Sequence, residues 1–139
     1  MIYITGANGR LGRQVLKIIP NAIPLVRRPI GLGNEVLTSF ETEDLKGKLK
    51  DADCIIHLAG SMEFFDMKAL WEANVELTRR IVGAAPEDCR IIFASSISVY
   101  GKKLAEKPAK EETCTAPDSP YAKSKLEAEE IIKKHANSI

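Results

Sequence analysis

The chain contains 139 residues, the size of one domain that can bury a sizeable core. Hydrophobic residues make up 45% and charged residues 28%, as in globular proteins, and the longest apolar stretches are too short to cross a bilayer. The 20 basic and 19 acidic residues leave a net charge of +1, which argues against nucleic acid or an anionic membrane as a partner.

Apolar periodicity predicts strands that alternate with helices along the whole chain. The expected strands are residues 2–5, 22–27, 35–40, 53–58 and 90–95, and the expected helices are residues 10–19, 42–50, 65–85 and 119–135. Residues 101–118 show little periodicity and are expected to form a loop. Strands alternating with helices imply a parallel sheet with right-handed crossovers. The sequence therefore predicts one domain, residues 1–139, of the doubly wound α/β class with about five strands.

Three glycines spaced three apart, Gly6, Gly9 and Gly12, join the first strand to the first helix in the stretch TGANGRLG. In a strand-to-helix turn, glycines allow the tight turn, let a ligand's phosphates approach the backbone, and let the helix pack close to the strand. The N–H groups and the dipole of the helix then favour a pyrophosphate. A glycine-rich turn without a ligand is the alternative. A Walker A phosphate loop is excluded, because no Gly-Lys-Ser/Thr follows.

The cysteine and histidine residues show no metal-binding or disulfide pattern. The three cysteines, Cys54, Cys89 and Cys114, form no Cys-x-x-Cys pair, so free thiols in a reducing cytoplasm are expected. No signal peptide is expected, because a strand-like run begins at residue 2. His57 lies in an apolar strand without carboxylates around it and is predicted to be a hydrogen-bonded core residue, whereas His135 is predicted to be solvated. No metal site is predicted.

Four further segments accompany the glycine turn: DCIIHLAG (53–60), ANVELT (73–78), FASSISVYG (93–101) and SPYAKSK (119–125). Together with TGANGRLG they resemble, in the same order, the motifs of the extended short-chain dehydrogenase/reductase superfamily, of the NAD(P)-dependent epimerase/dehydratase kind. The resemblance runs from residue 1 to about residue 133. It implies a Rossmann-type fold that binds a nicotinamide dinucleotide.

The resemblance also implies roles for individual residues. The cofactor would be held by Gly6, Asn8, Gly9, Arg10, Leu11, Gly12, Arg27, Arg28, Leu58, Ala59, Gly60, Asn74, Tyr121 and Lys125. For Asn74, a role in helix packing is the alternative. Tyr121 would be the acid/base, Lys125 would bind the nicotinamide ribose and lower the tyrosine's pKa, and Ser96 would hydrogen-bond the reacting oxygen. Tyr121 and Lys125 share a helix face, because they are four residues apart.

The second strand departs from the usual dinucleotide pattern. Many such folds place Asp or Glu at its end to bind the adenosine ribose hydroxyls. Here Arg27 stands at that place and Arg28 follows. A guanidinium suits a 2′-phosphate, so NADP is favoured over NAD, with a solvated basic pair as the alternative.

The resemblance covers only the cofactor half of the family's enzymes, so the chain is expected to lack their C-terminal substrate lobe. Three functions therefore stay open: a catalytic domain completed by another chain or by oligomerisation, a non-catalytic dinucleotide-binding module, or a fragment of a longer enzyme. A nucleotide sugar or a carbonyl compound is the expected substrate, but the sequence does not choose among epimerase, dehydratase and reductase. The sheet is expected to end at an open edge after residues 90–95. That edge, with the helices at 65–85 and 119–135, predicts a homodimer or a complex with a partner chain.

Overall fold

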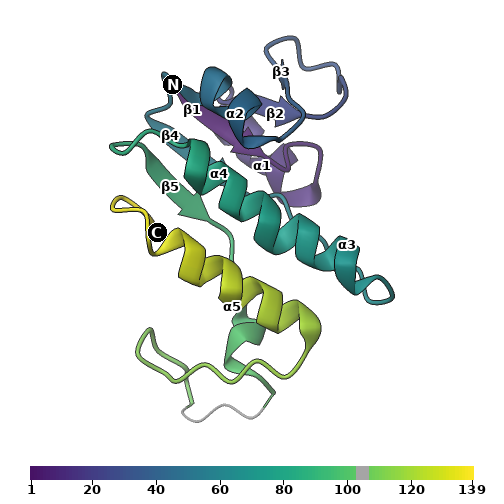
Figure 1. The fold of residues 1–139 in the computed structure, drawn as a ribbon, viewed down its shortest axis with the longest axis vertical. Coiled ribbons are helices and arrows are strands. Elements are labelled where there is room, and N and C mark those ends of the chain that lie inside the picture. Colours follow the sequence, from purple (N-terminus) through teal and green to yellow (C-terminus); the bar gives the residue numbers. More distant parts are fainter. Residues whose placement is uncertain (103–106) are drawn as a thin grey trace.

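The computed structural model describes residues 1–102 and 107–139. All of its strands belong to one parallel sheet with the order β3-β2-β1-β4-β5 (Figure 1). The strands are β1 (Ile2–Thr5), β2 (Ile23–Val26), β3 (Val36–Leu37), β4 (Cys54–His57) and β5 (Arg90–Phe93). The predicted doubly wound α/β class is therefore confirmed.

Helices connect the strands except between β2 and β3, which a loop joins. They are α1 (Arg10–Ile18), α2 (Thr42–Leu49), α3 (Met67–Trp71), α4 (Leu77–Ala84) and α5 (Pro120–Ile132), with a π-helical turn at Glu72–Glu76 and a 3₁₀ turn at Ile97–Tyr100. The single helix predicted for residues 65–85 is thus three segments joined end to end. The loop predicted for residues 101–118 includes residues 103–106, which lie outside the described residues. No helix in the described ranges is long and apolar enough to cross a membrane.

Each face of the sheet has its own apolar core. On one face Tyr3, Leu25 and Ile55 pack against Leu45 of α2 and Ile81 of α4. On the other face, Ile4 and Ile56 pack against Val15 and Leu16 of α1. Figure 1 shows α4 and α5 lying side by side on the face that α2 also covers. The carboxyl ends of β1 and β4 therefore emerge between α1 and α4, where this fold class binds ligands.

The third strand is shorter than the predicted 35–40, because polar side chains bend the chain after Leu37. The carboxylate of Asp44 accepts hydrogen bonds from the Thr38 hydroxyl (2.8 Å) and the Ser39 N–H (2.8 Å). Phe40 then takes the left-handed conformation with φ of 63°, which is uncommon for a bulky residue. Its ring is buried against the core.

The outer edge of β5 differs from the prediction, because it is paired rather than open. Ile91 donates its N–H to the Asn137 carbonyl (2.9 Å), and Ile139 donates its N–H to the Ile91 carbonyl (2.9 Å). Helix α5 ends at Ile132, three residues before the predicted end, so the chain can turn back along β5. His135 lies in this turn and is buried rather than solvated. Its Nε2–H donates to the Cys89 carbonyl (2.6 Å).

Candidate functional site

The glycine turn closes tightly around β1, β4 and α1. Gly6 has φ of +69°, and a Cβ there would lie 2.8 Å from the backbone of both Leu58 and Ala59. A Cβ on Gly12 would lie 2.2 Å from the Gly6 carbonyl oxygen. Side chains are therefore excluded at both positions, and α1 begins directly against the end of the strand.

Helix α1 presents an uncapped N-terminus at this turn. Gly9 precedes its first residue, donates its own N–H to the Gly6 carbonyl (3.0 Å), and supplies no side-chain cap. The first-turn residues Arg10, Leu11 and Gly12 have no intrahelical acceptor for their N–H groups. Such a helix end favours an anion, as the glycine spacing predicts.

A cleft of about 480 Å³ lies beside the turn and contains five of the predicted cofactor residues. Gly6, Asn8, Ala59, Arg27 and Arg28 all line it. Its remaining lining is apolar: Leu25, Val26, Ile30, Phe40 and Leu77. The Arg27 guanidinium lies 5.4 Å from the centre of the Phe40 ring, which closes the cleft on that side. The cleft therefore has apolar walls and a cationic end without an acid.

The carboxyl ends of β1 and β4 are tied to α4 through His57, which is fully buried as predicted. Nδ1 of His57 lies 2.7 Å from Oγ1 of Thr5, and Nε2 lies 3.0 Å from Oγ1 of Thr78. Burial, with Lys125 nearby, lowers the pKa of His57 to about 3, so the ring is neutral. Thr78 donates its hydroxyl proton to the Asn74 carbonyl (2.6 Å), so it accepts from Nε2–H. Nδ1 consequently accepts from Thr5, whose oxygen also accepts the N–H of Ala59 (3.1 Å).

Asn74 lies in the π-helical turn and bonds to the loop that follows β4. Its Oδ1 accepts the Ser61 N–H (2.7 Å), and its Nδ2 donates to the Ser61 carbonyl (2.9 Å) and to Oγ of Ser124 on α5 (2.9 Å). A Cβ on Gly60 would lie 2.9 Å from Asn74 Oδ1, so a larger residue there would displace the Asn74 amide. Asn74 has the packing role that the sequence left open, and its place beside a cofactor stays a prediction.

The three predicted catalytic residues lie at the end of β5 and on the first turns of α5. Ser96 Oγ accepts the Ser98 N–H (3.2 Å) and lies 2.8 Å from Ser98 Oγ. Lys125 is buried, and its Nζ donates to the Ala94 carbonyl (2.7 Å). Tyr121 is partly exposed one helical turn earlier. Ser119 caps α5 by accepting the Ala122 N–H (3.1 Å), which fixes where this helix begins.

The surroundings of Lys125 alter its charge equilibrium. Its Nζ also lies 4.1 Å from the centre of the Phe93 ring, which presents its face to the cation. Desolvation lowers the pKa of Lys125 to about 8, with Glu129 acting weakly in the opposite direction. The ammonium is therefore held by one carbonyl and one aromatic face rather than by a carboxylate.

Sequence reasoning missed several residues that build this site: Thr5, Phe40, Ser61, Thr78 and Phe93. One signal was available, because Thr78 stands four residues after Asn74 and so shares its helix face. The others contact partners far away along the chain. Among the residues the structure describes, no group of three His, Cys, Asp or Glu side chains could hold a metal ion.

Known proteins resemble this chain over nearly its whole length. The model of the NAD dependent epimerase/dehydratase family matches residues 2–139. A short-chain dehydrogenase/reductase superfamily protein from Agrobacterium tumefaciens, solved with bound NAD, has a TM-score of 0.82 and 31% identity, over 97% of this chain and 44% of that protein. The UDP-N-acetylglucosamine 4-epimerase from Bacillus cereus has a TM-score of 0.83 and 30% identity, over 94% of this chain and 48% of that protein.

A curated relative gives the same result in sequence. The UDP-glucose 4-epimerase of Azospirillum brasilense is 28% identical over 160 residues, which covers 95% of this chain and 43% of that enzyme. The chain thus spans less than half the length of these relatives. By its family match and its fold, the chain belongs to the NAD dependent epimerase/dehydratase family.

Proposed function

We propose that this chain binds a nicotinamide dinucleotide across the glycine turn and the adjoining cleft. The observation that carries the proposal is the convergence of Gly6, Asn8, Ala59, Arg27 and Arg28 on one cleft beside the uncapped end of α1. The pyrophosphate would lie against the N–H groups of Arg10, Leu11 and Gly12. Leu58 and Gly60 flank Ala59 at the end of β4, where small residues leave room for a ribose. The similar Agrobacterium protein is described with bound NAD.

We propose NADP rather than NAD as the preferred dinucleotide. Arg27 and Arg28 line the cleft at the end of β2, where an acid would bind the ribose hydroxyls of NAD. No acidic residue is among the described residues that line this cleft. Both guanidinium groups are exposed and could form charge-assisted hydrogen bonds to a 2′-phosphate.

The reaction we propose is hydride transfer at a hydroxyl or ketone carbon, and the bound dinucleotide would accept or return the hydride. Tyr121 would take the proton from the substrate hydroxyl and give it back in the reverse direction. Lys125, a buried cation on the same helix face, would favour the tyrosine phenolate by charge. The Ser96 hydroxyl would donate a hydrogen bond to the reacting oxygen, which its proton can do when Ser98 Oγ is the donor in the contact between the two hydroxyls.

The proposed substrate is a nucleotide sugar, because two similar proteins are UDP-sugar 4-epimerases by name. Since the chain spans less than half of these enzymes, the substrate-binding part would come from a longer protein or a partner chain. A non-catalytic dinucleotide-binding module is the second candidate. The observation that favours it is that Ser96, Lys125 and Asn74 all have their polar atoms engaged within the protein. Turnover with a panel of nucleotide sugars and carbonyl compounds separates the two.

Titration calorimetry with NADP and NAD tests the binding proposal. The unchanged protein should bind NADP more tightly than NAD, and Arg27→Ala should reduce this difference in affinity. Gly9→Val should weaken both dinucleotides while the fold survives, because its branched side chain would stand beside the uncapped end of α1. If the unchanged protein binds neither dinucleotide, the proposed function is wrong. Equal affinities for the two would contradict only the preference for NADP.

A further inference from the structure

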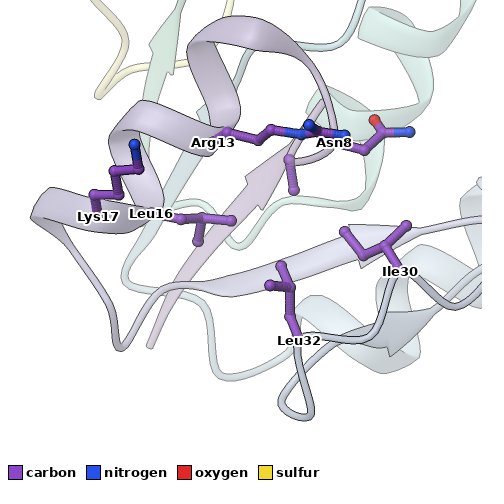
Figure 2. A pocket seen from close by; sticks show the side chains of 7 residues that line it. Asn8, Arg13, Leu16, Lys17, Ile30 and Leu32 are labelled. Atoms are coloured by element: carbon purple, nitrogen blue, oxygen red, sulfur yellow. The ribbon is translucent and has the colours of Figure 1, made fainter.

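A second pocket adjoins the cleft on the outer side of α1. Its volume is about 470 Å³, and it lies between α1 and the loop that joins β2 to β3. Both spaces are lined by Asn8 and Ile30, so they meet at these two residues. Beyond them the second pocket has an apolar wall, with Leu16 on the helix and Leu32 on the loop (Figure 2).

The loop side of this pocket is held in shape by one carboxylate. Glu35 accepts hydrogen bonds from the backbone N–H groups of Ile30 (3.0 Å), Gly31 (3.3 Å) and Leu32 (3.0 Å). These bonds, that of Leu32 foremost, lower the pKa of Glu35. The carboxylate is therefore used within the loop and does not line the pocket. It keeps Ile30 and Leu32 turned toward α1.

The helix side of the pocket carries two cations, Arg13 and Lys17. Figure 2 shows Arg13 extending toward Asn8, at the junction with the cleft, whereas Lys17 lies farther along α1, away from that junction. Lys17 donates to Oε1 of Gln14 at 3.4 Å. Arg13 is exposed, and no acidic side chain is among the described residues that line the pocket. The junction therefore faces the exposed guanidinium of Arg13 on α1 as well as the arginines at the end of β2.

We propose that Arg13 is a specificity-determining residue that completes a 2′-phosphate subsite with Arg28 at the junction of the two pockets. This inference rests on the proposed binding of NADP. With the pyrophosphate at the end of α1, the adenosine ribose would be held between Asn8 and the end of β2, which line the same cleft. A 2′-phosphate on that ribose would then lie within reach of Asn8, toward which Arg13 extends. Two planar guanidinium groups on opposite sides could each bind the phosphate oxygens with two N–H groups.

Dinucleotide affinities of matched variants test the subsite. Arg13→Ala should lower the affinity for NADP about 10-fold, because it removes hydrogen bonds to a charged group, and should leave NAD within about 2-fold. Lys17→Ala is the control, since it removes the same charge from the same helix, one turn farther from the junction than Arg13. It should change neither affinity by more than about 2-fold. Arg13→Lys should restore only part of the NADP affinity, because an ammonium lacks the planar fork.

The outcomes separate this inference from the proposed function. Equal losses for NADP and NAD in Arg13→Ala would show that Arg13 acts on the shared part of the dinucleotide and would overturn the subsite. Equal losses of NADP affinity in the Arg13 and Lys17 variants would show a general attraction of charge and would overturn it too. If Arg13→Ala changes neither the NADP nor the NAD affinity, the subsite is wrong, although the proposed dinucleotide site stands. The proposed function itself would be wrong only if the unchanged protein bound neither NAD nor NADP.

Discussion

Two glycine-to-alanine substitutions on different helices should change stability in opposite directions. At Gly12, the added Cβ would lie 2.2 Å from the Gly6 carbonyl oxygen and 2.7 Å from the Ala7 Cα. An ordinary carbon–oxygen contact is about 3.3 Å, so the helix end and the turn must separate by about 1 Å. Both neighbours are backbone atoms and cannot move aside easily. Gly12→Ala should therefore lower the free energy of unfolding by an amount near the upper end of the ~1–3 kcal/mol typical of overpacking.

The matched control is Gly47 on the exposed side of α2, where an added Cβ would meet nothing within 4 Å. Gly47→Ala should therefore stabilise the protein by about 1 kcal/mol through helix propensity alone. Urea unfolding measures both effects. With an m-value of about 2 kcal/mol/M, the midpoint should fall by roughly 1.5 M for Gly12→Ala and rise by roughly 0.5 M for Gly47→Ala. If Gly12→Ala unfolds at or above the midpoint of the unchanged protein, the close packing described for the turn is wrong.

Three further predictions concern pH, catalysis and assembly. The pKa of His57 is about 3 in the fold, below its unfolded value of 6.5, so its stabilising effect is complete above pH 6.5 and is lost as the pH falls toward 3. The free energy of unfolding, measured by chemical denaturation between pH 4.5 and about 7, should therefore rise with pH. A His57→Gln variant with the same pH dependence would exclude His57 as its source. In a complete enzyme, Tyr121→Phe should lower turnover by ~10² or more with little change in dinucleotide affinity, and a fully active variant would remove Tyr121 from the acid/base role. Sedimentation equilibrium at micromolar concentration should show self-association through α4 and α5 or uptake of a partner chain, and a thermally stable monomer would contradict it.

The sequence predicted the class of the fold because its strands are short apolar runs with helical periodicity between them. Residues 53–58 and 90–95 are covered on at least one face by helices, and both contain the observed strands. The prediction was weakest where a side chain competes with the backbone. Asp44 bonds to Thr38 and Ser39 and ends β3 early, and no hydrophobic pattern reports that contact. The left-handed backbone of Phe40 is likewise invisible in a sequence, because bulky residues rarely adopt it.

The site was predictable in its parts rather than in its connections. Gly6 and Gly12 follow from the spacing of the turn, and the structure gives both the close approaches that glycine permits. The hydrogen bonds of Asn74 to Ser61 and Ser124 join residues up to 50 positions apart, so no local pattern reveals them. Resemblance to the family identified Lys125, but its bond to the Ala94 carbonyl and its contact with Phe93 depend on how α5 packs against β5. The paired edge of β5 depends on where α5 ends.

The hydrogen bonds through His57 run in one direction, from the Ala59 N–H through Thr5 and the imidazole to Thr78 and the Asn74 carbonyl. Reversing any link would leave two protons facing each other at the next one, so the imidazole cannot change tautomer unless the hydroxyls turn together. Its Nε2 proton has no route to water while β1, β4 and α4 stay packed. Exchange of that proton with deuterium should therefore be as slow as that of the most protected backbone amides. One side-chain resonance would then report how often the centre of the domain opens.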